Sequence, residues 1–317
     1  MEMNVKAGIG QQKATVYGIL AIVLWSAIVG LIRSISESFG PIGGAALIYT
    51  VGSIFLVLLI GLPKISAFPK AYLWLGSLLF VSYEICLSLA LGFANNRVQA
   101  IELGMVNYLW PGFTVLLSVI VNKQKVNWWL YPGLLLSILG ISWVMSGDNS
   151  WSFRQMMENI QSNPLSYGLA FAGAIIWAMY CNITKIMSEG KNGMSLFFIL
   201  TALALWIQYF FTSPPEMVIT LRSVSMLLFA GAVIGVANAA WTVAIIRGHV
   251  ALLATLSYFT PIISTAFSSL LLSTALSFSF WQGVLMVTVG AIICWLAIIP
   301  YGFQDASRRQ GSESPGA

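Results

Sequence analysis

Glu84 is the residue of this sequence with the clearest chemical potential, because it is the only acidic residue near the middle of an apolar segment. A charged carboxylate at the centre of a bilayer costs roughly 2.5–3.5 kcal/mol, so such a group needs a partner or a proton. Ser77, Ser88 and Asn95 share one helical face with it, at spacings of seven, four and seven residues. We expect this stripe to face the protein interior. Glu84 then serves either as a binding or proton-coupling site or as a structural carboxyl bonded to a neighbouring helix.

A second group of candidates consists of aromatic side chains that lie away from the ends of apolar segments. These are Trp25, Tyr83, Tyr108, Trp177, Tyr180, Trp241 and Tyr258. Such rings can stack on an aromatic ligand or hold an ammonium group through a cation–π contact. For each ring the alternative is ordinary core packing, and the sequence leaves both interpretations open.

A stripe of small and polar residues in a later segment is the third candidate feature. Gly231, Gly235, Asn238 and Thr242 recur there at helical spacing, without a charge between them. Small residues let helices approach closely and leave room for a cavity. Asn238 is therefore the candidate hydrogen-bond donor to a ligand.

Charged residues near segment ends have simpler expected roles. Glu102 stands five residues after Arg97, so we expect a surface ion pair, with charge steering at a cavity mouth as the alternative. Arg33, Arg97 and Lys185 are expected to extend toward the lipid headgroups. His249, the one histidine of the sequence, is expected at the membrane interface.

Motifs for catalysis and metal binding are absent from the sequence. Cys86, Cys181 and Cys294 each lie inside an apolar segment without a CxxC pair, so neither a disulfide framework nor a zinc site is expected. The sequence also has no HExxH, GxSxG or paired-Asp motif. We therefore expect no enzyme, no cofactor and no metal.

The composition implies that helices in a membrane position these side chains. Of 317 residues, 58% are hydrophobic and 8% are charged, against about 25% charged in average soluble domains. The basic residues occur singly or in pairs at segment ends and form no patch, which argues against nucleic acid as a partner. The expected partners are a lipid bilayer and a small-molecule substrate, with no obligate protein partner.

The apolar segments predict an all-α polytopic membrane protein with ten transmembrane helices, arranged as two inverted five-helix repeats. The predicted spans are 14–32, 42–62, 71–94, 98–121, 127–146, 165–187, 193–212, 223–246, 250–272 and 278–299. The charge-free stretch 250–304 is too long for one helix, so we place a tight hairpin at 273–277.

These spans divide the chain into two repeats, a connection and a tail. The predicted units are a first repeat at 1–146, a polar connection at 147–164, a second repeat at 165–300 and a polar cytoplasmic tail at 301–317. Basic residues are more frequent in the loops on the side of both termini, while Arg33, Arg97, Arg154 and Arg222 fall on the other side. The positive-inside rule therefore places both termini in the cytoplasm.

An offset of 150 residues relates the two halves. At this offset Tyr17-Gly18 falls on Tyr167-Gly168, Tyr108 on Tyr258, Pro111 on Pro261, Ser118 on Ser268, Gly133 on Gly283 and Gly140 on Gly290. With an odd number of spans in each half, the second repeat enters from the opposite side, as in carriers that work by alternating access. Pro111 and Pro261 can kink equivalent spans as hinges, or be static packing kinks. Their neighbours Tyr108 and Tyr258 rank first among the aromatic candidates.

Several stretches resemble a known family. They are Leu24-Trp25-Ser26, VSYEICLSLALGFA from Val81, IELGMVNYLWP from Ile101, PLSYGLAF from Pro164 and LSFSFWQG from Leu276. These are similar to segments of the aromatic amino acid exporters of the YddG type, which carry paired EamA domains and belong to the drug/metabolite transporter superfamily. The likeness covers nearly the whole chain, apart from the first dozen residues and the tail after Pro300.

The resemblance implies a ten-helix transporter of the inner membrane that moves aromatic and other neutral amino acids outward through a central cavity between the repeats. No Lys or Arg lies at mid-span to receive a substrate carboxylate, so we expect modest affinity and broad selectivity. The alternative function is a multidrug or quaternary-cation efflux carrier, because aromatic walls with Glu84 would also hold a lipophilic cation. Proton antiport, another coupling ion and facilitated export all remain open.

Overall fold

The computed structural model describes residues 10–121, 126–146, 151–189, 191–212, 215–247 and 256–297, and every regular element in these residues is helical. The elements are α1 (Gln11–Ser26), α2 (Ile28–Phe39), α3 (Pro41–Ile60), a 3-10 turn (Ile65–Ala67), α4 (Lys70–Gly92), α5 (Arg97–Asn107), α6 (Trp110–Val121), α7 (Leu130–Val144), α8 (Phe153–Ser162), α9 (Pro164–Met187), α10 (Met194–Phe211), α11 (Leu221–Arg247), α13 (Thr260–Leu271) and α14 (Phe278–Leu296). His249, the start of the predicted connection at 147–150 and the predicted tail at 301–317 lie outside the described residues.

The helices have the length and polarity of membrane spans. Within the described residues seven are long and apolar enough to cross a membrane, or eight if the bent pair α1 and α2 counts as one span. Leu58, Trp74 and Phe211 are 77%, 80% and 88% exposed, as lipid-facing side chains would be. α7 and α13 are apolar but shorter, at 15 and 12 residues. The chain is therefore a multi-pass membrane protein.

Two predicted spans are broken rather than continuous. The first, predicted at 14–32, bends by 41° at Ala27 and continues as α2 to Phe39. The prediction ended it too early because Arg33 looked like a boundary, whereas Arg33 is paired with Glu37 one turn later. The fourth, predicted at 98–121, is interrupted between Asn107 and Trp110.

Pro111 and Pro261 are each the second residue of a helix, α6 and α13 respectively. A proline in the first turn of a helix costs little, because that N–H has no intrahelical acceptor. The hairpin predicted at 273–277 is confirmed: α13 ends at Leu271 and α14 begins at Phe278. Ser269 Oγ donates to the Thr274 carbonyl at 2.6 Å and closes this turn.

The predicted polar connection contains a short helix, α8. Ser152 caps its first turn by accepting a hydrogen bond from the Gln155 amide at 3.2 Å. Asn159 Nδ2 donates to the Met145 carbonyl at 2.7 Å and ties α8 to the end of α7. No residue of α8 is buried, so this helix lies on the surface of the bundle.

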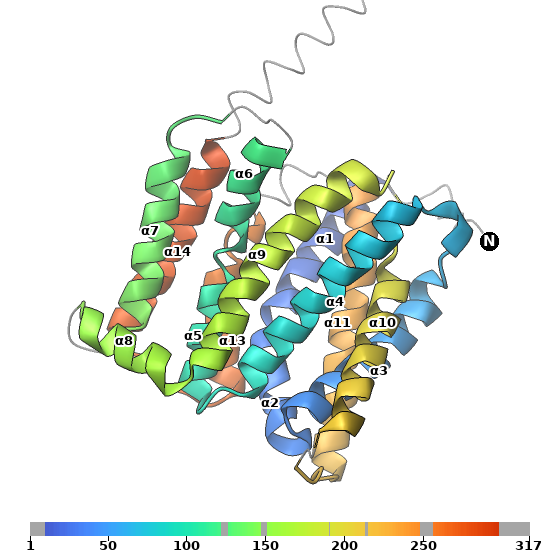
Figure 1. The fold of residues 1–317 in the computed structure, drawn as a ribbon, viewed down its shortest axis with the longest axis horizontal. Helices are drawn as coiled ribbons and strands as arrows, with labels where there is room; N and C mark the ends of the chain where they lie inside the picture. Colours follow the sequence, from blue (N-terminus) through green and yellow to red (C-terminus); the bar gives the residue numbers. More distant parts are fainter. Residues whose placement is uncertain are drawn as a thin grey trace, which may run out of the picture.

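The helices pack as pairs, as Figure 1 shows. α7 and α14 lie side by side at one edge of the bundle, and α3 and α10 pack together at the other. Between them α4 packs along α9, and α1 packs along α11. The pair α4 and α9 corresponds to the third and sixth predicted spans, and the pair α1 and α11 to the first and eighth. The 150-residue offset relates the third span to the eighth and the first to the sixth, so it relates one pair to the other.

Glycines bring two helix pairs into close contact. A Cβ on Gly140 would lie 2.8 Å from the Gly283 carbonyl oxygen, and one on Gly290 would lie 2.6 Å from that of Gly133. Between these contacts Ser137 Oγ lies 3.5 Å from the carbonyl of Val287, the residue 150 positions later. α7 and α14 thus meet backbone to backbone, where only glycine fits.

The same packing occurs between α3 and α11. A Cβ on Gly235 would lie 3.0 Å from the Gly52 carbonyl oxygen, and one on Gly231 would lie 2.3 Å from Val51. The close helix contact expected from the stripe of small residues is therefore present.

Candidate functional site

An aromatic cluster around Trp177 brings together three of the predicted site residues. The ring centroids of Tyr83 and Trp177 are 4.4 Å apart, and those of Trp177 and Tyr180 are 5.1 Å apart in a stacked arrangement. Trp110 meets Trp177 edge-on at 6.4 Å, and Phe80 lies 5.4 Å from Tyr180. We call these five residues the Trp177 cluster. It joins α4, α6 and α9 inside the bundle and offers aromatic faces and edges to an aromatic or cationic group.

Trp25 and Trp241 form a separate aromatic pair. Their ring centroids are 4.9 Å apart and join α1 to α11. The predicted aromatic residues therefore divide into two groups, because this pair joins α1 to α11 whereas the Trp177 cluster joins α4 to α9. Trp241 also packs against the small buried cluster of Ile22 and Ala244.

Glu84 of α4 bonds to Tyr49 of α3. The Tyr49 hydroxyl on α3 donates to Glu84 Oε2 at 2.5 Å, and the Tyr49 ring packs 5.4 Å from Phe198. Among the described residues no basic nitrogen lies within ion-pair distance of Glu84. The carboxyl therefore depends on a tyrosine rather than on a cation. Neighbouring Tyr83 contacts α9, so the two residues face different helices.

The polar stripe predicted around Glu84 is shorter than expected. Ser88 is fully buried and its hydroxyl has no partner among the described residues. Ser77 donates to the carbonyl of Leu73 within α4. α4 ends at Gly92, so Asn95 lies beyond it, and Asn95 Nδ2 donates to the Ser162 carbonyl at 3.2 Å. The helical spacing failed for Asn95 because the helix had already ended.

A second buried carboxyl–tyrosine pair was missed by the sequence interpretation. Glu102 is 7% exposed, and the Tyr167 hydroxyl donates to its Oε2 at 2.6 Å, joining α5 to α9. The expected surface ion pair between Glu102 and Arg97 is wrong, because Arg97 points instead to Glu37, at 2.7 Å. Nothing in local spacing could have linked Glu102 to a tyrosine 65 residues away.

Arg33 and Arg97 do not extend freely toward headgroups as expected. Arg33 binds Glu37 at 3.1 Å and donates to the Ala94 carbonyl at 2.6 Å. Arg97 binds the same carboxylate and donates to the Leu272 carbonyl at 2.8 Å. This group, which we call the Glu37 cluster, ties α2 and α5 to the hairpin between α13 and α14.

Three further predicted site residues, Asn238, Tyr108 and Tyr258, are not members of the Trp177 cluster. Asn238 is buried in α11, and its Nδ2 donates to the Ile234 carbonyl one turn earlier at 2.9 Å. Tyr108 and Tyr258 each lie two residues before a helix, α6 and α13 respectively. Tyr108 packs against the main hydrophobic core, whereas the Tyr258 ring packs 5.9 Å from Trp295 of α14. The two tyrosines at equivalent sequence positions therefore have different surroundings.

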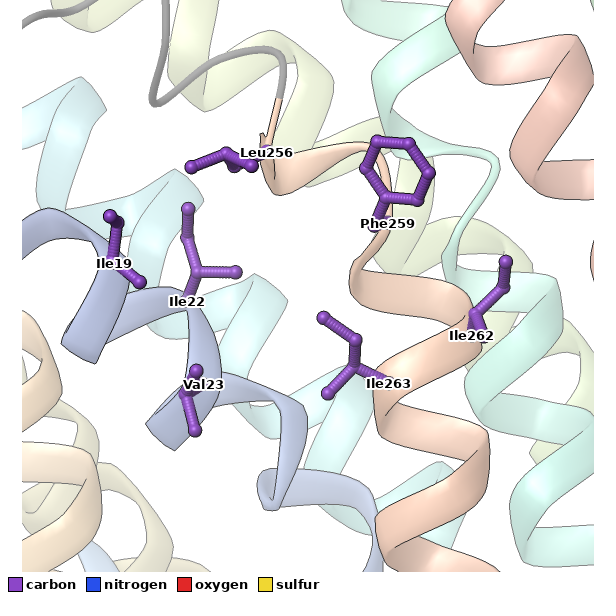
Figure 2. Close-up of a pocket in the computed structure, with 7 residues that line it drawn as sticks. All are labelled: Ile19, Ile22, Val23, Leu256, Phe259, Ile262 and Ile263. Carbon is purple, nitrogen blue, oxygen red and sulfur yellow. The ribbon is translucent and has the colours of Figure 1, made fainter.

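The cavity in Figure 2 lies between α1 and the α13 region, and it is apolar. Its volume is about 330 Å³, and Ile22 and Val23 face Ile263 across it. The remaining lining residues are Ile19, Leu256, Phe259 and Ile262. None of the predicted site residues lines it, so this cavity suits an apolar chain and offers no partner to a charged group.

Titratable side chains do not gather as metal ligands in the described part of the chain. No group of three or more His, Cys, Asp or Glu residues that could hold a metal ion occurs there. Cys86, Cys181 and Cys294 are free thiols.

The fold and the site together define a membrane transporter: a helical bundle with paired broken helices, buried carboxyls and an internal aromatic cluster. The model of the EamA-like transporter family matches residues 12–146 and 164–296, and the chain belongs to this family. It is 52% identical to the aromatic amino acid exporter YddG of Salmonella typhimurium (strain 14028s / SGSC 2262) over 286 residues, covering 90% of this chain and 98% of that one. The exporter of the same name from Escherichia coli (strain K12) is also 52% identical, over 287 residues.

More distant comparisons agree with the fold. The aromatic amino acid exporter YddG of Ancylobacter novellus is 25% identical, covering 91% of this chain and 97% of its own. A solved crystal structure superimposes with a TM-score of 0.64 at 22% identity, covering 92% of this chain and 99% of the other.

Proposed function

We propose that this protein exports aromatic and other neutral amino acids from the cytoplasm. The observation that carries the proposal is the Trp177 cluster, whose rings lie 4.4–6.4 Å apart within the bundle. The 52% identity to two proteins named as aromatic amino acid exporters, over nine-tenths of the chain, supports the same cargo. Such rings bind the aromatic side chain of a substrate well, through offset or edge-on stacking.

The proposed mechanism is alternating access in a bundle of ten spans, built as two inverted five-helix repeats at 1–146 and 165–300, with a connection at 147–164. The crosswise contacts Gly140–Gly283 and Gly133–Gly290 support this arrangement. A two-fold axis between two equivalent helices produces such reciprocal contacts, in which each residue meets the equivalent of its neighbour. Ser137 and Val287, 150 residues apart, lie where that axis would pass.

The moving parts in this mechanism are the helices that meet at the breaks. Pro111 and Pro261 serve as hinges at the starts of α6 and α13, where the helical hydrogen-bond ladder is already interrupted. The proposed lining of the transport path is Trp25, Tyr83, Glu84, Tyr108, Trp177, Tyr180, Asn238, Trp241 and Tyr258. In this mechanism Glu84 serves as the coupling carboxyl, because it is buried beside a tyrosine and without a cation.

The proposed location is the inner membrane, with both termini and the tail at 301–317 in the cytoplasm. The proposed transporter has no enzymatic activity and needs no cofactor. The excess of basic residues in loops on the side of the termini supports this orientation. It places the Glu37 cluster at the outer end of the bundle.

The competing function is efflux of lipophilic or quaternary cations. Its support is that aromatic faces also hold cations. The two functions differ in what competes for transport. Neutral amino acids inhibit transport by an amino acid carrier, whereas they do not inhibit transport by a cation carrier.

Reconstitution in liposomes tests the proposal. Labelled phenylalanine, tryptophan, threonine and a cationic drug are each measured with and without a pH gradient. Saturable flux of the aromatic amino acids that Trp177→Ala reduces about tenfold is expected, because a lost ring contact of ~1.4 kcal/mol corresponds to that factor. Flux of the drug alone, unaffected by phenylalanine, would establish the competing function instead.

A further inference from the structure

Asn107 is a buried amide with an unused oxygen beside the Trp177 cluster. It is 5% exposed, and its Oδ1 has no hydrogen-bond partner among the described residues. Its Nδ2 faces the Tyr83 hydroxyl at 3.4 Å, which is long for a hydrogen bond. A buried acceptor without a donor destabilises the fold, and a ligand that supplies the donor removes that cost.

The backbone at Asn107 adds a second acceptor. Asn107 is the last residue of α5, and residue 111, whose amide would bond to the Asn107 carbonyl in a continuous helix, is proline. Proline has no N–H to donate. The carboxyl end of a helix also carries partial negative charge, which attracts a cation. Both the side chain and the helix end therefore favour a positively charged donor.

Gly173 of α9 faces Asn107 Oδ1 without a side chain. A Cβ at Gly173 would lie 3.6 Å from Asn107 Oδ1, 3.8 Å from Tyr83 Cδ2 and 3.5 Å from Cys86 Cβ. These are ordinary contact distances, so a group the size of a methyl fits without displacing anything. Because residue 173 is glycine, no side chain of α9 covers Asn107 Oδ1 on this side.

We propose that Asn107 Oδ1 and the ring of Tyr83, on the side where Gly173 carries no side chain, form a binding site for the α-ammonium group of the substrate. This inference rests on the proposed function and adds the determinant that selects for an amine. The Tyr83 ring contributes a cation–π contact, and the rest of the Trp177 cluster is left to hold the substrate side chain. An aromatic acid without the amine leaves Oδ1 unpaired and binds weakly.

The experiment measures binding of labelled phenylalanine to purified protein, with unlabelled phenylalanine, phenethylamine and 3-phenylpropionate as competitors. For the unaltered protein we expect phenethylamine to compete and 3-phenylpropionate to be at least tenfold weaker than phenylalanine. Asn107→Leu should weaken phenylalanine at least tenfold, whereas Asn107→Asp should keep the preference for amines, because a carboxylate accepts the same bonds.

Gly173→Ala tests access to Oδ1, because its methyl would lie 3.6 Å from Asn107 Oδ1 and cover it on this side without a clash. We expect it to weaken phenylalanine binding at least tenfold at unchanged thermal stability. Gly168→Ala is the matched control on the same helix, since nothing lies within 4 Å of a Cβ there, and it should bind as the unaltered protein does.

Two results would overturn the site while leaving amino acid export standing. One is phenylalanine binding unchanged by both Gly173→Ala and Asn107→Leu, and the other is 3-phenylpropionate competing as well as phenylalanine. Absence of saturable phenylalanine binding to the unaltered protein would instead overturn the proposed function and this site with it.

Discussion

Buried carboxyls held by tyrosines are the most unusual residues of this bundle. Glu84 pairs with Tyr49 and Glu102 pairs with Tyr167, at 2.5 and 2.6 Å, and neither has a basic residue within ion-pair distance in the described structure. A neutral hydroxyl compensates a buried charge less than a cation does. Both carboxyls are thus suited to taking up and releasing protons as their surroundings change.

Glu84→Gln tests the coupling role. The amide keeps the size and can still accept from Tyr49, but it cannot exchange a proton. We expect flux to fall about tenfold, the equivalent of ~1.4 kcal/mol, and its dependence on external pH to flatten. The measurement is liposome flux at a series of external pH values, with Glu158→Gln on exposed α8 as control. Flux equal to that of the unaltered protein at every pH would exclude coupling by Glu84.

Glu102 and Tyr167 should behave as an energetic unit. In a double-mutant cycle with Glu102→Gln and Tyr167→Phe, we expect a coupling of about 1 kcal/mol or more in thermal stability. Hydrogen bonds between membrane helices average about 0.6 kcal/mol, and bonds to charged groups exceed this. Strictly additive effects would show that the 2.6 Å contact contributes nothing.

For individual residues, the sequence identified a buried hydrogen-bond acceptor but not the side chain that donates to it. Glu84 stood out because an acid in an apolar segment is costly wherever it lies. Tyr49 could not be assigned to it, since tyrosines are frequent in the chain and the pairing depends on how α3 packs against α4. Asn107 was overlooked for the same reason: an unpaired oxygen is recognised only once its neighbours are known.

At the scale of elements, close contact between helices at glycine residues is the main feature of the packing. α7 and α14 approach so closely that a Cβ on Gly283 would lie 2.7 Å from the Gly140 carbonyl oxygen. Since backbone cannot move aside as a side chain can, a substitution there forces the helices apart. The sequence predicted Gly133 as the equivalent of Gly283 and Gly140 as the equivalent of Gly290, but not that Gly140 contacts Gly283 and Gly133 contacts Gly290.

Gly283→Ala should therefore destabilise the protein. Overpacking of a tight interface costs typically 1–3 kcal/mol, and we expect a loss in that range, measured by thermal unfolding in detergent. Gly168→Ala, which adds the same methyl to open space on α9, should leave stability unchanged. Equal melting temperatures for both variants would contradict the close contact.

Helix breaks were the hardest elements to predict. The hairpin at 273–277 was placed correctly because two helices had to fit in one charge-free stretch. The bend at Ala27 was not, since no proline or glycine stands at that position. The break at Tyr108 was foreseen only as a kink at Pro111, because sequence reveals where an N–H is missing but not how far the helix unwinds before it.

At the scale of the molecule, the Glu37 cluster fastens one end of the bundle. Glu37 binds both Arg33 and Arg97, and through them α2, α5 and the α13–α14 hairpin are joined. Alternating access requires such an end to open. Breaking these bonds should shift the population toward the conformation that is open there.

Glu37→Gln should therefore make the interior more accessible. We expect native Cys86, which is half-buried on α4, to react several-fold faster with a water-soluble maleimide. The matched control is Glu158→Gln, which breaks an exposed Arg154–Glu158 pair and should change nothing. A labelling rate of Cys86 identical in the two variants would contradict a gating role for the cluster.

The division into two repeats follows from the 150-residue offset and stays a prediction, whereas the conformation could not be predicted from the sequence. The surroundings of Tyr108 and Tyr258 differ although their sequence positions are equivalent. Two halves of a carrier differ in this way in any one state, because one side is closed while the other is open. Because one sequence adopts both the inward-open and the outward-open conformation, the sequence does not indicate which of the two a single structure represents.

Counterflow in liposomes distinguishes export by alternating access from flow through a pore. Liposomes that contain the protein are loaded with unlabelled phenylalanine and diluted into a trace of labelled phenylalanine. A carrier that alternates between two sides exchanges one molecule for the other, so the account predicts a transient accumulation of label above equilibrium, which Trp177→Ala abolishes. Label that only equilibrates, or that enters equally fast without internal phenylalanine, would contradict export by alternating access.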